Sequence, residues 1–129
     1  MGRRRFAVSS GLGPVTHTLT LPIRTKGPNG SHGHWSVLAR RRKRERSWAR
    51  QACPRFALPA VVTLTRLSAG TLDDDNLRGA LKGVRDGIAD ALGVPDNDPR
   101  VRWAYAQAKC PRGQAGVRID LEPSTEPSP

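Results

Sequence analysis

The chain has 129 residues, of which 36% are hydrophobic, and it carries a formal net charge of +11 at pH 7. This length accommodates one domain with a modest core, and no apolar run approaches the roughly 18 residues of a membrane span, so we expect no membrane-spanning segment. The surplus of Lys and Arg favours an anionic partner such as nucleic acid over a small neutral ligand.

The N-terminal quarter is predicted to hold a basic arm, a strand and a loop. Residues 1–14 are basic and interrupted by Gly, Ser and Pro, which is typical of a flexible arm. Alternation with Thr over residues 15–21 predicts a half-buried strand, and a Gly-rich loop follows over residues 24–34. His32 and His34 lie in this loop either as metal ligands or as polar residues near a substrate. Because no Cys or third His completes a zinc set, the second interpretation is favoured.

A helix is predicted from Trp35 to Ala52, where Pro54 ends it. A basic run is often only a solvated helix face, but the density of charge here favours contacts with nucleic-acid phosphates, which position a polyanion without reading its sequence. Trp35 either stacks on an unpaired base or belongs to the core. The basic residues in the middle of this helix are Arg40, Arg41, Arg42, Lys43, Arg44 and Arg46.

A second strand and a second helix are predicted next. Residues 60–67 are apolar and β-branched, which predicts a buried strand. Apolar residues at helical spacing then form a single stripe over residues 77–92. Asp75 or Asn76 is expected to cap the start of this helix, and Gly93 its end.

The second helix also carries a row of glycines, Gly79, Gly83 and Gly87, spaced four residues apart. Each costs about 1 kcal/mol of helix propensity relative to Ala. The row indicates either that another backbone approaches closely or that a well-packed helix tolerates the weakness.

The last part of the chain is predicted to form two strands and a tail. Alternating patterns over residues 101–107 and 117–122, with Pro111 and Gly113 between them, predict a hairpin, and residues 123–129 are typical of a disordered tail. The element order β-α-β-α-β-β predicts a single small α+β domain, with a mixed or antiparallel sheet and two helices.

Seven of the eleven acidic residues lie between Asp73 and Asp98, with only three basic residues among them. If the chain at Asp73 and Asp75 is extended, the two side chains point the same way with Cα atoms roughly 6.5 Å apart. Carboxylate oxygens suit Mg²⁺ or Mn²⁺ better than zinc. The alternative is an acidic helix N-terminus, stabilised by the helix dipole. Asp96 and Asp98 form a second pair, in a sequence that is otherwise typical of a turn.

The whole segment from Leu64 to Trp103, LTRLSAGTLDDDNLRGALKGVRDGIADALGVPDNDPRVRW, resembles the core of the RusA-type Holliday junction resolvases and their phage-borne relatives. The shared pattern is a strand, Asp-x-Asp-Asn-Leu, a helix, and an Asp-rich turn that leads into a strand. The similarity covers about residues 15–122. It implies a Mg²⁺-dependent endodeoxyribonuclease, with Mn²⁺ as a possible substitute, that resolves four-way DNA junctions by paired symmetric nicks in recombination and repair.

The resemblance also implies roles for individual residues. The metal-binding aspartates of the family correspond to Asp73, Asp75 and Asp98, with Asp96 as a candidate helper. The family has an important lysine six residues after the first aspartate, and this chain has Gly79 there. Either Lys82, one turn further along the helix, or the adjacent Arg78 is expected to replace it, and Arg78 is also expected to contact DNA.

One subunit is not expected to bring all these carboxylates together. The helix over residues 77–92 is about 24 Å long, whereas the six residues after Leu92 span at most roughly 20 Å. We therefore expect a homodimer in which two copies of this helix pack antiparallel through the glycine row, so that each site combines Asp73 and Asp75 of one subunit with Asp98 of the other.

The expected setting is the cytoplasm of a bacterium or of a phage-infected host, because residues 6–12 are too polar for a signal peptide. The expected partner is branched DNA, with no membrane. One alternative is a non-catalytic nucleic-acid-binding protein with the same fold. Another, a structural protein that binds ribosomal RNA, fits the charge but not the carboxylate cluster.

Overall fold

A computed structural model of the chain describes residues 16–24, 35–111 and 113–124. The predicted arm, the loop with His32 and His34, and residues 125–129 lie outside the described residues. The domain is α+β, with the predicted element order. Neither helix is long and apolar enough to cross a membrane. The elements are β1 (His17–Leu21), α1 (Trp35–Ala52), β2 (Ala60–Ser68), α2 (Asp74–Leu92), β3 (Val101–Lys109) and β4 (Gly116–Pro123).

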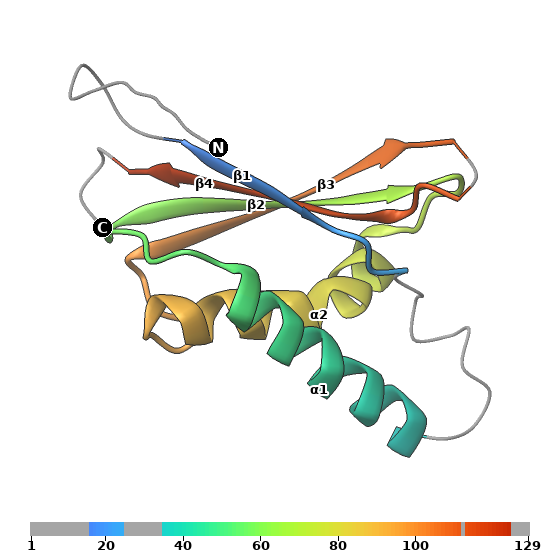
Figure 1. Ribbon diagram of the computed structural model, residues 1–129, viewed down its shortest axis with the longest axis horizontal. Helices are drawn as coiled ribbons and strands as arrows, with labels where there is room; N and C mark the ends of the chain where they lie inside the picture. The colour runs from blue at the N-terminus through green and yellow to red at the C-terminus, as the bar shows by residue number, and fades with distance from the viewer. Residues whose placement is uncertain (1–15, 25–34, 112, 125–129) are drawn as a thin grey trace.

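The four strands form one mixed sheet in the order β1-β4-β2-β3. β2 and β3 are parallel, with Ala60 opposite Val101 and Ser68 opposite Lys109, whereas β4 runs antiparallel to both β1 and β2. Both helices lie on the same face of the sheet (Figure 1). β1 and β3 are therefore the edge strands, and the described elements leave the other face of the sheet uncovered.

The predicted hairpin between the last two strands is wrong, because β2 lies between β3 and β4. The chain leaves β2, crosses the sheet through α2 and returns as a parallel neighbour of β2, as crossover connections do. β4 then occupies a central position. Val117, Ile119 and Leu121 are completely buried there, which requires sheet neighbours on both sides and a helix layer above.

The core lies between the sheet and α2. The predicted apolar stripe is confirmed, since Leu81, Val84 and Ile88 of α2 are fully buried against the sheet. β2 contributes Val62 and Leu64, both with no exposed surface. α1 forms an outer layer that packs mainly on α2.

The start of α2 differs from the prediction. Asp73, not Asp75 or Asn76, is the N-cap, and its side chain accepts a hydrogen bond from the Asn76 N–H at 2.9 Å. Asp73 is extended, but the helix begins at Asp74, so Asp75 already lies in the helix and the side chains of Asp73 and Asp75 do not share a strand face. The predicted end is confirmed: Gly93 caps the helix with a φ of 77°.

Gly83 and Gly87 of the glycine row face α1 of the same chain. A Cβ atom on Gly83 would lie 2.8 Å from the Arg42 carbonyl oxygen, and one on Gly87 would overlap the Arg46 carbonyl oxygen. The close approach of another backbone is therefore confirmed, but the neighbour is α1. A dimer in which two copies of α2 meet through this row is wrong, because α1 already occupies it.

Candidate active site

The two acidic segments lie at opposite ends of α2. Asp73 and Asp75 are at its first turn, and Asp96 and Asp98 are in the turn between its C-terminus and β3. The 19 residues of the helix span about 28 Å. Within residues 16–24, 35–111 and 113–124, no three His, Cys, Asp or Glu side chains lie close enough together to hold a metal ion. A single subunit thus keeps the two segments apart, as the helix length predicted.

The segment before Asp73 is held by the edge strand β3. Gln107 lies on β3 and forms two hydrogen bonds with the backbone of Leu72. Its Oε1 accepts from the Leu72 N–H at 2.8 Å, and its Nε2 donates to the Leu72 carbonyl at 2.7 Å. This paired contact fixes Asp73 relative to the C-terminal half of β3. Asp75, two residues further on, is exposed.

The turn at the other end of α2 is stabilised around Asp98. The carboxylate of Asp98 accepts a hydrogen bond from the Arg100 N–H at 2.8 Å and two from the Arg100 guanidinium, at 2.9 and 3.1 Å. These hydrogen bonds from Arg100 lower the pKa of Asp98, so its ionised form is favoured. The side chain of Asp98 is only 13% exposed.

Arg85 of α2 connects the same turn to β3, a role that the sequence analysis missed. Its guanidinium donates to the Asp96 carbonyl and to the Tyr105 hydroxyl, both at 2.8 Å. It also lies 4.7 Å from the centre of the Trp103 ring, close enough for a cation–π contact. The Trp103 indole N–H donates to the same Asp96 carbonyl at 2.9 Å. Arg85 and Trp103 together therefore position the turn that carries Asp98.

A row of cations lies on α2 between the two acidic segments. Arg78, Lys82 and Arg85 are spaced at i, i+4 and i+7, on the side of the helix next to β3 and away from α1. The guanidinium of Arg78 lies 5.6 Å from the centre of the Tyr105 ring. Lys82 is half-exposed, and its Nζ lies 3.4 Å from a carboxylate oxygen of Asp86.

A hollow of about 290 Å³ opens beside this row. It brings Lys82 and Arg78 together with Asp96, so one small space combines cations that can hold a phosphate with a carboxylate. Gly79 adds no side chain to it. The residues that line the hollow are Arg78, Gly79, Lys82, Arg85, Asp96 and Tyr105.

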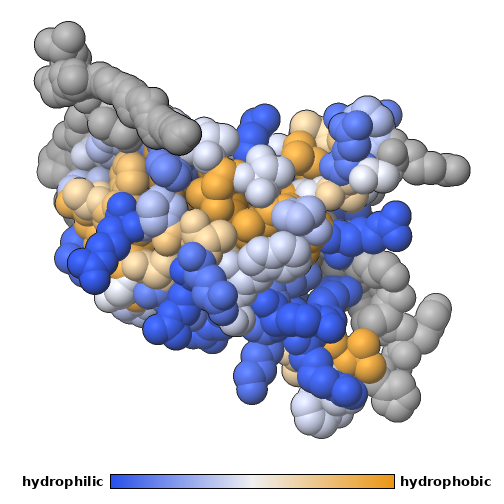
Figure 2. All heavy atoms as spheres, in the orientation of Figure 1, coloured by the Kyte–Doolittle hydropathy of each residue, from blue (hydrophilic) through white to orange (hydrophobic). Residues whose placement is uncertain are grey.

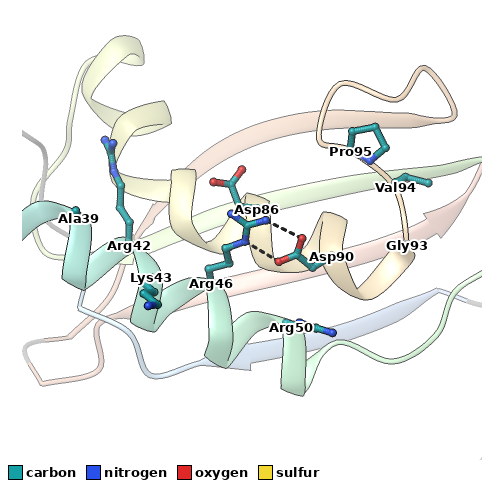
Figure 3. A pocket seen from close by; sticks show the side chains of 10 residues that line it. All are labelled: Ala39, Arg42, Lys43, Arg46, Arg50, Asp86, Asp90, Gly93, Val94 and Pro95. Atoms are coloured by element: carbon teal, nitrogen blue, oxygen red, sulfur yellow. Dashed lines mark hydrogen bonds and ion pairs between the residues drawn. The ribbon is translucent and has the colours of Figure 1, made fainter.

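The six basic residues in the middle of α1 fall into two groups, three that contact other groups of the domain and three that are exposed. Arg42 donates to the Gly79 carbonyl at 3.3 Å, and Arg46 forms two hydrogen bonds with the Asp90 carboxylate, at 2.6 and 2.9 Å (Figure 3). The bonds from Arg46 lower the pKa of Asp90. The Nε of Arg41 lies 3.9 Å from a carboxylate oxygen of Glu45. These three arginines of the predicted DNA-binding set therefore contact groups within the domain.

The other three, Arg40, Lys43 and Arg44, are exposed. Hydrophilic side chains gather over the helix layer, on the lower side of the molecule in Figure 2. An open cleft of about 940 Å³ lies between α1 and the C-terminal half of α2, with Lys43 and Arg50 on its α1 wall (Figure 3). Trp35, whose alternatives were stacking or core packing, is 82% exposed and so lies outside the core.

Comparisons with protein-family models and with curated proteins gave no match to this chain. The resemblance of residues 64–103 to the RusA-type resolvases therefore stays a prediction from the sequence.

Replacing Arg85 with Met is expected to lower the free energy of unfolding by about 2–3 kcal/mol, because the change leaves the Tyr105 hydroxyl and the Asp96 carboxylate without this partner. The measurement is urea unfolding, with hydrogen exchange of residues 96–101 as a local readout. The matched control is Lys82→Met on the same face of α2, where a half-exposed i,i+4 pair is worth about 0.5 kcal/mol or less. Equal losses in the two variants would contradict the positioning role of Arg85.

Proposed function

We propose that this protein is a homodimeric endodeoxyribonuclease that uses Mg²⁺ or Mn²⁺ to resolve four-way DNA junctions by paired nicks. Its setting would be DNA recombination and repair in the cytoplasm of a bacterium or of a phage-infected host. The observation that carries the proposal is that both acidic segments are attached to one edge strand, β3, near its opposite ends.

The free edge of β3 suits pairing with a second copy. Among the described strands β3 pairs only with β2, so one edge of its backbone is left for another strand. Asp98 comes three residues before Val101 at the start of β3, whereas Gln107, near its end, holds Leu72 next to Asp73. If two β3 strands pair antiparallel about a two-fold axis, the start of each lies beside the end of the other.

Each Asp98 would then lie near Asp73 and Asp75 of the partner subunit. Both segments belong to the helix-covered side of the sheet, since they flank α2. The expected site in trans is therefore retained, with β3 edges replacing the glycine row as the contact between subunits. A dimer with two such sites also suits a four-way junction, which needs one nick on each of two symmetric strands.

The residues fit the chemistry of a divalent metal. Asp73, Asp75, Asp98 and Asp96 offer only oxygen ligands, which Mg²⁺ and Mn²⁺ prefer. When bound, such an ion polarises the scissile phosphate and lowers the pKa of a water molecule. Cations of the chain complement this chemistry. Lys82, with Arg78 and Arg85, would hold the phosphate beside the carboxylates, while the exposed cations of α1 grip the DNA arms.

A second candidate is a non-catalytic nucleic-acid-binding protein of the same fold. It is favoured by the contacts that the acidic side chains already make within the domain. Asp73 caps α2, and Asp98 binds Arg100 through both carboxylate oxygens. Each of these contacts stabilises the fold without any metal.

The two candidates are separated by incubating the protein with a synthetic four-way junction and with linear duplex of the same sequence. The proposed nuclease nicks the junction symmetrically when Mg²⁺ or Mn²⁺ is present, leaves the linear duplex intact, and loses all cleavage in EDTA. Gel analysis of end-labelled strands gives the positions of the nicks. Tight binding of the junction without cleavage in either metal would refute the nuclease and favour the second candidate.

A further inference from the structure

α1 has an exposed flank that combines apolar and basic side chains. Val37, Arg40, Arg44 and Trp48 occur at i, i+3, i+7 and i+11, so they lie on one side of the helix over about 16 Å. All four are exposed, and the exposed fractions of Val37 and Trp48 are 51% and 44%. We call these four residues the outer flank of α1.

The outer flank is distinct from the two surfaces of α1 described above. The side of α1 that faces α2 contains Glu45 and Ala49, which meet the glycines of α2. The side that lines the cleft contains Lys43 and Arg50. The packing of the helix layer therefore leaves the outer flank uncovered within the described part of the chain.

We propose that the outer flank of α1 binds single-stranded nucleic acid, with the Trp48 indole stacked on an unpaired base and with Arg40 and Arg44 contacting adjacent phosphates. Proteins that hold single strands combine aromatic platforms with cations that follow the backbone. Arg44 and Trp48 are one helical turn apart, which gives one cation and one ring at neighbouring positions along a strand. This binding needs no metal and does not depend on the nuclease activity proposed above.

Charge argues against the other occupants of this flank. Two copies of α1 that met here across a two-fold axis would bring Arg40 and Arg44 of each subunit against those of the other, and like charges disfavour such contacts. An intact duplex would engage the arginines through its phosphates, but its stacked bases offer no face to Trp48. A strand with unpaired bases uses both kinds of side chain.

The test measures binding by fluorescence anisotropy in EDTA, with labelled oligothymidylate of about 12 nucleotides, oligouridylate of equal length, and a duplex of matched length. Trp48→Ala is expected to weaken binding of the single strands about tenfold and to leave duplex binding within about twofold. Comparison of the thymidylate and uridylate losses distinguishes DNA from RNA as the source of the strand. Trp48→Phe, which keeps an aromatic face, is expected to restore most of the affinity.

Arg50→Ala is the matched control, because it removes a cation from the other flank of α1 and is expected to weaken single-strand and duplex binding equally. Circular dichroism and thermal unfolding establish that each variant is folded. If Trp48→Ala does not fold, the comparison of single strand with duplex is made with Trp48→Phe. Equal losses for single strand and duplex in Trp48→Ala, or no loss for either, would overturn the proposal. A change in the oligomeric state of Trp48→Phe, measured by sedimentation velocity, would also overturn it and would identify the flank as a subunit contact.

Discussion

Mixing Asp75→Asn subunits with Asp98→Asn subunits is expected to restore junction cleavage that neither variant has alone. In the proposed site, each substitution would remove a carboxylate charge next to the reacting phosphate. A metal site contributes several kcal/mol of charge stabilisation, so each variant should lose about a hundredfold or more in rate. In a mixed dimer whose sites are shared between subunits, both substitutions fall in one site and the other site is intact.

Random exchange of subunits makes half of the dimers mixed, so about a quarter of all sites should recover. A mixed dimer makes only one of the two nicks, and its product is a nicked junction rather than two resolved duplexes. Denaturing and native gels separate these products. Asp74→Asn is the control within the same acidic turn and is expected to keep cleavage. No recovery in the mixture, with exchange verified by differently tagged subunits, would mean that each subunit carries its own complete site.

Gly87→Ala is expected to lower the free energy of unfolding by about 2–4 kcal/mol, although Ala is intrinsically the better helix former by about 1 kcal/mol. The added methyl group would overlap the carbonyl oxygen of Arg46 and lie 2.8 Å from the Cβ of Ala49. The first of these atoms belongs to the backbone of α1, which can give way only if the two helices move apart. The measurement is urea unfolding followed by circular dichroism.

Gly70→Ala serves as its control, because a Cβ atom at Gly70 would meet no other atom within 4 Å. This substitution is expected to change stability by at most about 0.5 kcal/mol. Loss of stability in Gly87→Ala should also release the Arg46–Asp90 ion pair, which joins the same two helices. A Gly87→Ala protein as stable as the parent would show that α1 does not pack closely on α2 in solution.

Most of the fold could be predicted from local patterns. The apolar stripe of α2, the strand β2 and the cap at Gly93 are encoded by residues close together in the sequence, and each was found where its pattern indicated. The pairing of β3 could not be obtained in this way. The short connection between β3 and β4, with its turn residues, favoured a hairpin of these two strands. Their actual pairing is decided by the crossover from β2 through α2 to β3 and by the burial of β4 in the middle of the sheet. Trp103 and Tyr105 of this edge strand are partly buried, and their contacts with Arg85 become visible only in the structure.

The candidate site was predicted in part. The separation of Asp75 from Asp98 follows from helix length, and this separation is the basis of the proposal that a second subunit completes the site. Arg85 and Gln107 were missed, because their importance comes from contacts between distant parts of the chain, across 11 and 35 residues. The helical spacing of Arg78, Lys82 and Arg85 was the one signal for Arg85 in the sequence. The glycine row predicted a close neighbour but could not identify it as α1.

The contacts that attach α1 to α2 also set how strongly binding should respond to salt. Arg42 and Arg46 already donate to acceptors on α2, so they are less available than Arg40, Lys43 and Arg44 to neutralise phosphates and release the counterions of a bound polyanion. The slope of affinity against salt concentration reports the number of phosphates neutralised. For this helix the number of neutralised phosphates should match the number of outward-facing cations, which is smaller than the number of basic residues in the run. Raising the salt concentration should therefore weaken the binding of nucleic acid less steeply than the net charge suggests.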